Sequence, residues 1–178
     1  GAILAVLLIF WNKMWPFDFS KKGKDIIKVD IFNMWFKVIV AMIPSGILGI
    51  LFDDFLEEHF GNPVTIAIML IVYGIAFIII ENRGEKKNAV RDIANMSYVT
   101  AFTIGLFQAL SMIPGTSRSG ATIVGALLIG VSRVAAAEFT FFLAVPTMVG
   151  ASLLKLVKFG FNFTSAELIM LLLGMIVA

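Results

Sequence analysis

Residues 93–132 read IANMSYVTAFTIGLFQALSMIPGTSRSGATIVGALLIGVS and carry a single charge, Arg118, near their centre. Pro114 and Gly115 stand just before that arginine, and a Pro–Gly pair ends a helix. The arm that follows, residues 119–132, would measure only about 21 Å as a helix, against roughly 30 Å for the hydrocarbon core of a bilayer. The pattern predicts a helix–break–helix hairpin that enters a membrane and returns to the same side. The alternative is two tilted spans joined by an ordinary outer loop.

The rest of the chain is equally apolar. Of its 178 residues 60% are hydrophobic and 15% are charged, whereas soluble domains have about 45–50% and 25%. The apolar residues come in long blocks of the length that crosses a bilayer. We therefore predict an all-α polytopic membrane protein that forms a single membrane domain over residues 1–178. The expected spans are residues 34–52, 64–80 and 136–154, with a re-entrant helix pair at 97–132 and incomplete spans at 1–15 and 164–178.

The loops predict a topology. Lysines and arginines gather in residues 12–33 and 81–92, and acidic residues gather in residues 53–58 between them. Positive residues enrich short cytoplasmic loops, so the two basic loops are assigned to the inside and the acidic loop to the outside. Lys155 and Lys158 then fall on the outer side, against this rule. Because both ends of the sequence lie inside apolar runs, we expect the chain to be a fragment.

Composition excludes several function classes. The net charge is +2, and the basic residues lie mainly in the predicted loops. There they indicate the membrane topology, so no nucleic-acid partner is expected. The chain has no cysteine, which excludes disulfide and thiolate chemistry. His59 is the single histidine, and a HExxH zinc site cannot be built from it. No metal ligand is predicted in this chain.

The polar segment at residues 114–122 is the part suited to chemistry, with four hydroxyls, one guanidinium and two glycines. The planar fork of Arg118 suits phosphate oxygens. Gly115 and Gly120 would let backbone N–H groups approach a ligand closely. Ser117 is predicted to cap the following helix, whose free N–H groups would face the same point. These features predict an anion site, most naturally for phosphate; the alternative is that Arg118 is paired elsewhere in the bundle.

A polar stripe leads down to this segment. Thr100, Thr103, Gln108 and Ser111 fall within an arc of about 140° on a helix. The threonines are also explained by hydroxyl bonds to their own helix backbone or to neighbouring helices. Gln108 is harder to explain in this way, because a primary amide at that depth needs partners.

Three strings carry a resemblance to a known family: GLFQALSMIPGTSRSGAT at residues 105–122, GVSRVAAAEFTF at 130–141 and AVP at 144–146. Together they resemble the undecaprenyl-diphosphate phosphatases of the bacitracin-resistance (BacA) type over about residues 93–154. The PGTSRSG string is long and unusual, which makes this signal specific.

The resemblance implies a multi-pass enzyme of the bacterial cytoplasmic membrane that removes one phosphate from undecaprenyl diphosphate and so regenerates the lipid carrier of cell-wall synthesis. It implies two inverted-topology repeats, each with a re-entrant helix pair. It further implies a divalent cation, Mg²⁺ or Ca²⁺, with ligands outside this chain, and membrane lipid as a partner. The sequence leaves open whether the protein forms a homo-oligomer. The residues that match are Arg118, Ser117 and Ser119 as catalytic groups, and Gln108, Gly115, Thr116, Gly120 and Thr122 as substrate-binding groups.

Two departures accompany the resemblance. The family's glutamate-rich stretch ending in a Ser-Gly-His string normally precedes the point where this sequence begins, and without it we expect the chain to be inactive. Position 100 is Thr, where many members have an acidic residue. The alternative functions are a broken-helix transporter or binder of lipid phosphates or anions, an acid-phosphatase-type lipid phosphatase and a non-catalytic scaffold segment.

Overall fold

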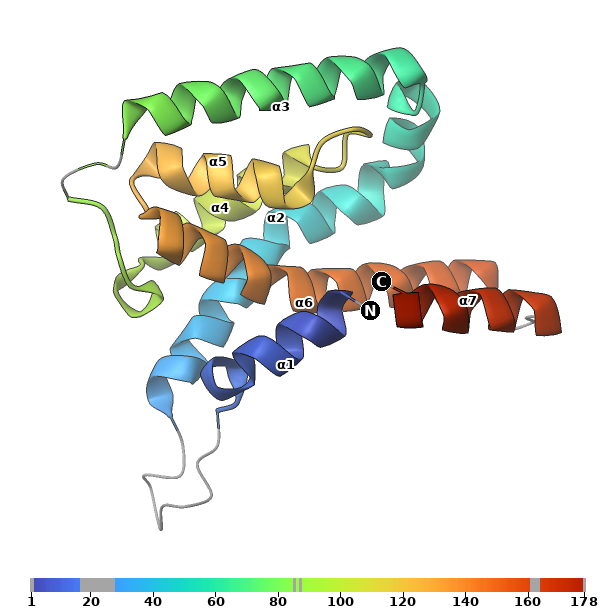
Figure 1. Ribbon diagram of the computed structural model, residues 1–178, viewed down its shortest axis with the longest axis horizontal. Helices are drawn as coiled ribbons and strands as arrows, with labels where there is room; N and C mark the ends of the chain where they lie inside the picture. The colour runs from blue at the N-terminus through green and yellow to red at the C-terminus, as the bar shows by residue number, and fades with distance from the viewer. Residues whose placement is uncertain (1, 17–27, 85, 87, 161–163, 178) are drawn as a thin grey trace, which may run out of the picture.

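A computed structural model describes residues 2–16, 28–84, 86, 88–160 and 164–177 (Figure 1). These residues are helical apart from turns and one isolated parallel bridge between Val90 and Val131, so the predicted all-α class is confirmed. The elements are α1 (Ala2–Met14), α2 (Val29–Phe60), α3 (Pro63–Arg83), the short 3₁₀ helix η2 (Ile93–Asn95), α4 (Tyr98–Leu110), α5 (Arg118–Ile129), α6 (Arg133–Phe159) and α7 (Ser165–Val177).

Three of these helices contain segments long and apolar enough to cross a membrane, namely Val29–Phe52, Pro63–Ile80 and Arg133–Lys158. The segment in α3 has no residue buried inside the molecule. Its large aliphatic side chains face outward, as Ile71 does with 61% exposure. A soluble protein rarely exposes so continuous an apolar surface, so these helices fit a lipid environment.

The core lies where α2, α4, α5 and α6 meet. Phe139 of α6, Ile104 of α4 and Val38 of α2 are fully buried there. Helix α2 crosses the molecule and makes its most extensive contact with α4, while α3 runs along α5 (Figure 1). Gly105 permits the close approach of α2 and α4, since a Cβ at this position would lie 2.1 Å from the carbonyl oxygen of Ala41. Small residues of this kind let membrane helices pack closely.

A buried lysine ties the entrance of α4 to α2. Lys37 is only 4% exposed, and its Nζ donates hydrogen bonds of 2.8 Å to the carbonyl oxygens of Ile93 and Ala94. These carbonyls belong to η2, which Asp92 caps by accepting a bond from the Ala94 N–H. The short helix is therefore held from both sides just before α4 begins.

The predicted break between the two arms of residues 93–132 is present. Helix α4 ends at Leu110 and α5 begins at Arg118, with Pro114 in the turn between them. The predicted helix cap is also confirmed, because the Ser117 side chain accepts a 3.2 Å bond from the Gly120 N–H. With 13 and 12 residues, each helix is only about 20 Å long.

One of the two lysines that ran against the predicted topology, Lys158, lies beside an acidic residue. Lys158 Nζ in the last turn of α6 is 3.1 Å from Asp54 Oδ1 of α2, and both side chains are exposed. The C-terminal end of α6 therefore lies next to the acidic segment that the same topology places outside. Lys158 is neutralised locally, which explains how a cation can stand on that side.

Candidate anion-binding site at the start of helix α5

The turn between α4 and α5 packs tightly on α3. Gly115 has φ +92°, a conformation that favours glycine, and a Cβ there would lie 2.6 Å from Ile66 Cα. A Cβ on Gly120 would approach Ser117 Cβ to 3.1 Å and Phe77 Cε2 to 3.2 Å. Both glycines thus have a packing reason in this chain. Their predicted role in letting a ligand approach stays a prediction.

The first turn of α5 presents its polar groups outward. Ser117 and Ser119 are exposed, and their hydroxyl oxygens are 3.3 Å apart. No residue within the described ranges accepts a hydrogen bond from the backbone N–H groups of Arg118 and Ser119. Such N–H groups, together with the positive end of the helix dipole, form a favourable place for an anion.

Two buried polar atoms next to this turn have no hydrogen-bond partner among the described residues, Arg118 Nη1 and Thr116 Oγ1. Arg118 is half-buried, and no carboxylate in the described part of the chain forms an ion pair with it. A buried polar group without a partner is costly, and a buried cation more so. Both atoms can donate hydrogen bonds, which is the kind of group that the oxygens of an anion accept from.

Thr122 faces away from this opening. Its side chain is 1% exposed. The hydroxyl donates towards the carbonyl oxygens of Arg118 at 3.0 Å and Ser119 at 3.1 Å, and it accepts a 3.1 Å bond from Thr140 of α6. In this structure Thr122 holds the first turn of α5 in place, and its predicted contact with substrate stays a prediction.

Gln108 is engaged with α2. It is 2% exposed, and its Nε2 donates a 2.7 Å hydrogen bond to Ser45 Oγ. The Ser45 hydroxyl in turn donates to the Met42 carbonyl at 3.2 Å. The partner that a deep amide requires is therefore a hydroxyl on the neighbouring helix. In the same polar stripe, Thr103 Oγ1 donates to the Val99 carbonyl of its own helix. For Thr103, a bond to its own helix backbone is therefore the explanation.

Ser45 and Thr140 are the residues around the site that sequence reasoning missed. They lie 63 residues from Gln108 and 18 residues from Thr122. Ser45 had one usable signal, because it is a hydroxyl next to Pro44 inside an apolar run. Thr140 had none beyond its place in the GVSRVAAAEFTF string.

The described residues offer no cluster suited to a metal. Among them, no three His, Cys, Asp or Glu side chains lie close enough together to hold an ion. The functional groups gathered at the start of α5 are hydroxyls, a guanidinium and backbone N–H groups. All of them can donate hydrogen bonds to an anion.

Comparison with known proteins assigns the chain to a family. The profile of the bacitracin resistance protein BacA family matches residues 1–178. The chain belongs to the BacA family. Its relatives include proteins named undecaprenyl-diphosphatase from Enterococcus faecalis, 68% identical, from Lachnoclostridium phytofermentans, 61% identical, and from Desulfitobacterium hafniense, 56% identical. Each match covers 100% of this chain.

The BacA-family chain spans 64–65% of the length of these relatives. Its three long apolar helices and its family together identify it as a multi-pass membrane protein. The PGTSRSG string of this BacA-family chain forms the turn between α4 and α5 and the first turn of α5. The segment that carried the resemblance is thus the segment that gathers unpartnered hydrogen-bond donors.

Proposed function

We propose that this chain carries the phosphate-holding part of a site that hydrolyses undecaprenyl diphosphate to undecaprenyl phosphate and inorganic phosphate in the bacterial cytoplasmic membrane. The observation that carries the proposal is the pair of buried atoms that have no partner among the described residues, Arg118 Nη1 and Thr116 Oγ1, beside the N-terminus of α5. The names of relatives 56–68% identical to this chain support the same reaction.

The reaction breaks the bond between one phosphorus and the oxygen that bridges the two phosphates, and it forms a bond from that phosphorus to the oxygen of water. Negative charge spreads over the transferring group in the transition state. The guanidinium of Arg118 and the N–H groups of Arg118 and Ser119 would donate to its oxygens from fixed positions. Ser117 and Ser119 would add hydroxyls, either as ligands or as a transient acceptor of the phosphoryl group.

A divalent cation, Mg²⁺ or Ca²⁺, belongs to the proposal, since it would neutralise the diphosphate when bound. The described residues do not supply a ligand set for it. The groups of this chain therefore act on the phosphate oxygens directly, and ligands for the cation would come from elsewhere in the protein.

Helices α4 and α5 would enter and leave the membrane on the same side as a re-entrant pair within an inverted-repeat fold. Each is about 20 Å long, which is short of the roughly 30 Å of a hydrocarbon core. The turn between them packs on α3 and on α5 itself through Gly115 and Gly120. Surrounding protein of this kind is what non-helical backbone needs at membrane depth.

The test uses a protein of the relatives' full length that contains residues 1–178, purified in detergent with no membrane gradient. We expect release of inorganic phosphate from undecaprenyl diphosphate in the presence of Mg²⁺ or Ca²⁺. Tight binding of the lipid diphosphate without any release would support the broken-helix transporter instead. Unchanged binding and turnover in both Ser117→Ala and Gln108→Leu variants would favour a scaffold segment.

A further inference from the structure

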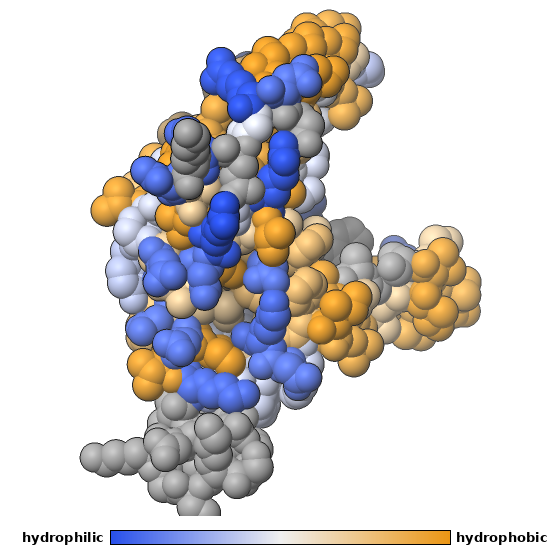
Figure 2. Space-filling view, turned by 60° about the vertical axis from the view of Figure 1, so that its left-hand side comes forward, coloured by the Kyte–Doolittle hydropathy of each residue, from blue (hydrophilic) through white to orange (hydrophobic). Residues whose placement is uncertain are grey.

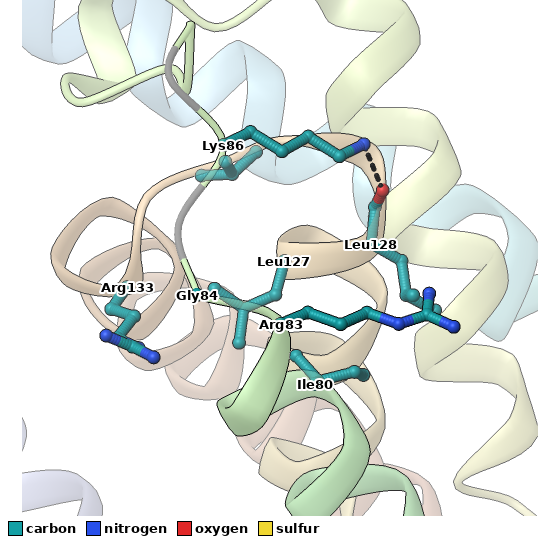
Figure 3. Close-up of a pocket in the computed structure, with 8 residues that line it drawn as sticks. Ile80, Arg83, Gly84, Lys86, Leu127, Leu128 and Arg133 are labelled. Atoms are coloured by element: carbon teal, nitrogen blue, oxygen red, sulfur yellow. Dashed lines mark hydrogen bonds between the residues drawn. The ribbon is translucent and has the colours of Figure 1, made fainter.

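A second cationic feature lies at the other end of α5. A pocket of about 190 Å³ opens between the end of α3, the end of α5 and the start of α6. Figure 3 shows Arg83 at the end of α3, Lys86 just after that helix and Arg133 at the start of α6 placed around it. The aliphatic part of the lining includes Ile80, Leu127 and Leu128.

The described residues that line the pocket include three cations, Arg83, Lys86 and Arg133. None of the residues that line the pocket in the described part of the chain is acidic. Lys86 Nζ donates a 2.8 Å bond to the Leu128 carbonyl (Figure 3), which satisfies an end group of α5. Arg83 is exposed, and among the described residues none forms an ion pair with it. Its fork of donors matches a phosphate group.

The position of the pocket at the end of an apolar segment fits the depth of a lipid headgroup. The apolar segment Pro63–Ile80 ends at Ile80, and the pocket begins at the same residue. Next to it, Ile79 is 47% exposed and Ile129 is 37% exposed, so aliphatic surface continues from the cations towards the hydrocarbon. Figure 2 shows this end of the molecule as a hydrophilic band bordered by hydrophobic surface.

This pocket is separate from the anion site described above. Arg118 and Leu128 stand at opposite ends of α5, about 15 Å apart along the helix axis. Neither Arg118 nor any residue of the PGTSRSG turn lines the pocket.

We propose that this pocket binds the headgroup of an anionic phospholipid, with the phosphate at Arg83 and Lys86 and the acyl chains along the exposed aliphatic face of α3 and the exposed Leu128 and Ile129 in the last turn of α5. Basic pockets between membrane helices on the cytoplasmic side bind such headgroups. The predicted topology places the basic loop at residues 81–92, which contributes Arg83 and Lys86, on that side. The lipid would link α3 to the junction of α5 and α6. The proposal does not depend on the proposed phosphatase reaction.

The test measures lipid binding by native mass spectrometry on the detergent-purified protein of the relatives' full length. Phosphatidylglycerol and phosphatidylcholine with the same acyl chains are titrated against the wild type and single-charge variants. Arg83→Gln removes the pocket cation, and Arg83→Lys keeps the charge. Lys28→Gln is the matched control, because Lys28 is an exposed cation outside the pocket in the other basic loop. Melting temperatures without lipid verify that each variant is folded.

The wild type should bind phosphatidylglycerol more tightly than phosphatidylcholine. Arg83→Gln should weaken phosphatidylglycerol binding about fivefold, the equivalent of one surface cation, while Arg83→Lys should retain most of the affinity. Lys28→Gln should change it less than twofold. The proposal is overturned if Arg83→Gln binds like the wild type, or if Lys28→Gln loses as much. It is also overturned if inorganic phosphate at the lipid's concentration displaces the lipid, since the site would then be one for a free ion.

Discussion

Thr140 of α6 donates a hydrogen bond to the hydroxyl of Thr122 in α5, with 3.1 Å between the two oxygens. Both side chains are buried, and Thr122 passes the link on to the carbonyl oxygens of Arg118 and Ser119. The turn that carries Arg118 is therefore oriented by the neighbouring helix. Hydroxyl bonds between membrane helices are modest in strength, so their effect is mainly on position.

Replacing Thr140 by Val should loosen this turn. The change removes the hydroxyl at nearly constant volume, and the free energy of unfolding should fall by about 0.6 kcal/mol, the average for such bonds in membrane helices. Phosphate release should fall several-fold because the position of Arg118 is less well defined. Thermal unfolding in detergent and steady-state kinetics check both effects. Thr140→Ser keeps the donor and should behave like the wild type; equal losses in the two variants would point to packing instead.

Replacing Ser45 of α2 by Ala should disturb the site through Gln108 of α4. Gln108 Nε2 would lose its 2.7 Å acceptor, and an unsatisfied buried donor costs about 1–3 kcal/mol. We expect a lower melting temperature and reduced turnover, while Ser45→Thr, which retains a hydroxyl, should restore most of both. If Ser45→Ala is indistinguishable from the wild type in both measurements, the Ser45–Gln108 contact has no positioning role.

Alanine substitutions should have opposite effects at Gly105, where α4 contacts α2, and at Gly150 in α6, where there is open space. A Cβ at Gly105 would lie 2.1 Å from the backbone oxygen of Ala41, whereas at Gly150 it would meet nothing within 4 Å. Gly105→Ala should lower stability by about 1–3 kcal/mol or more, because backbone on both sides has no room to move. Gly150→Ala should be neutral or stabilising by up to about 1 kcal/mol, since alanine suits a helix interior better. Melting curves in one detergent compare the two, and similar curves would refute the close approach.

Hydropathy predicted much of this architecture, but it indicates which residues can lie in the hydrocarbon core and not where a helix begins or ends. The apolar run at residues 34–52 lies inside α2, which begins at Val29 and continues through acidic residues to Phe60. Charged residues end a membrane span without ending a helix, so this extension has no apolar signal. The break before Arg118 was predictable because Pro114 and Gly115 act locally, and so was the cap at Ser117.

The side-chain partners around the site were not predictable. Helical spacing placed Thr122 on the face of Arg118, but the fold turns its hydroxyl towards Thr140. Gln108 needed a partner, and although Ser45 stands out as a hydroxyl in an apolar run, nothing in the sequence paired it with Gln108. These contacts depend on how α2 and α6 pack against the central pair, which is a tertiary property.

Lys37 supplies a further prediction about the entrance of α4. Lys37→Met would remove the donor that serves the carbonyl oxygens of Ile93 and Ala94. Hydrogen bonds to charged groups contribute about 1.5–3 kcal/mol, so stability should fall by about 2 kcal/mol. Amide exchange in η2 should accelerate as well. Lys155→Met, at an exposed position, is the matched control; if it has the same effect, loss of charge alone is the cause.

The most direct test of the central claim is phosphate release from undecaprenyl diphosphate by Arg118 variants of the relatives' full-length protein. Arg118→Ala should lower turnover by at least about a hundredfold, since a donor aimed at charge in the transition state contributes about that much. Arg118→Lys should recover only a small part, because a lysine lacks the planar fork. Circular dichroism and melting temperature should stay close to the wild type, because the guanidinium Nη1 has no hydrogen-bond partner to lose among the described residues. Near-normal phosphate release from folded Arg118→Ala would contradict the claim that this side chain holds the diphosphate.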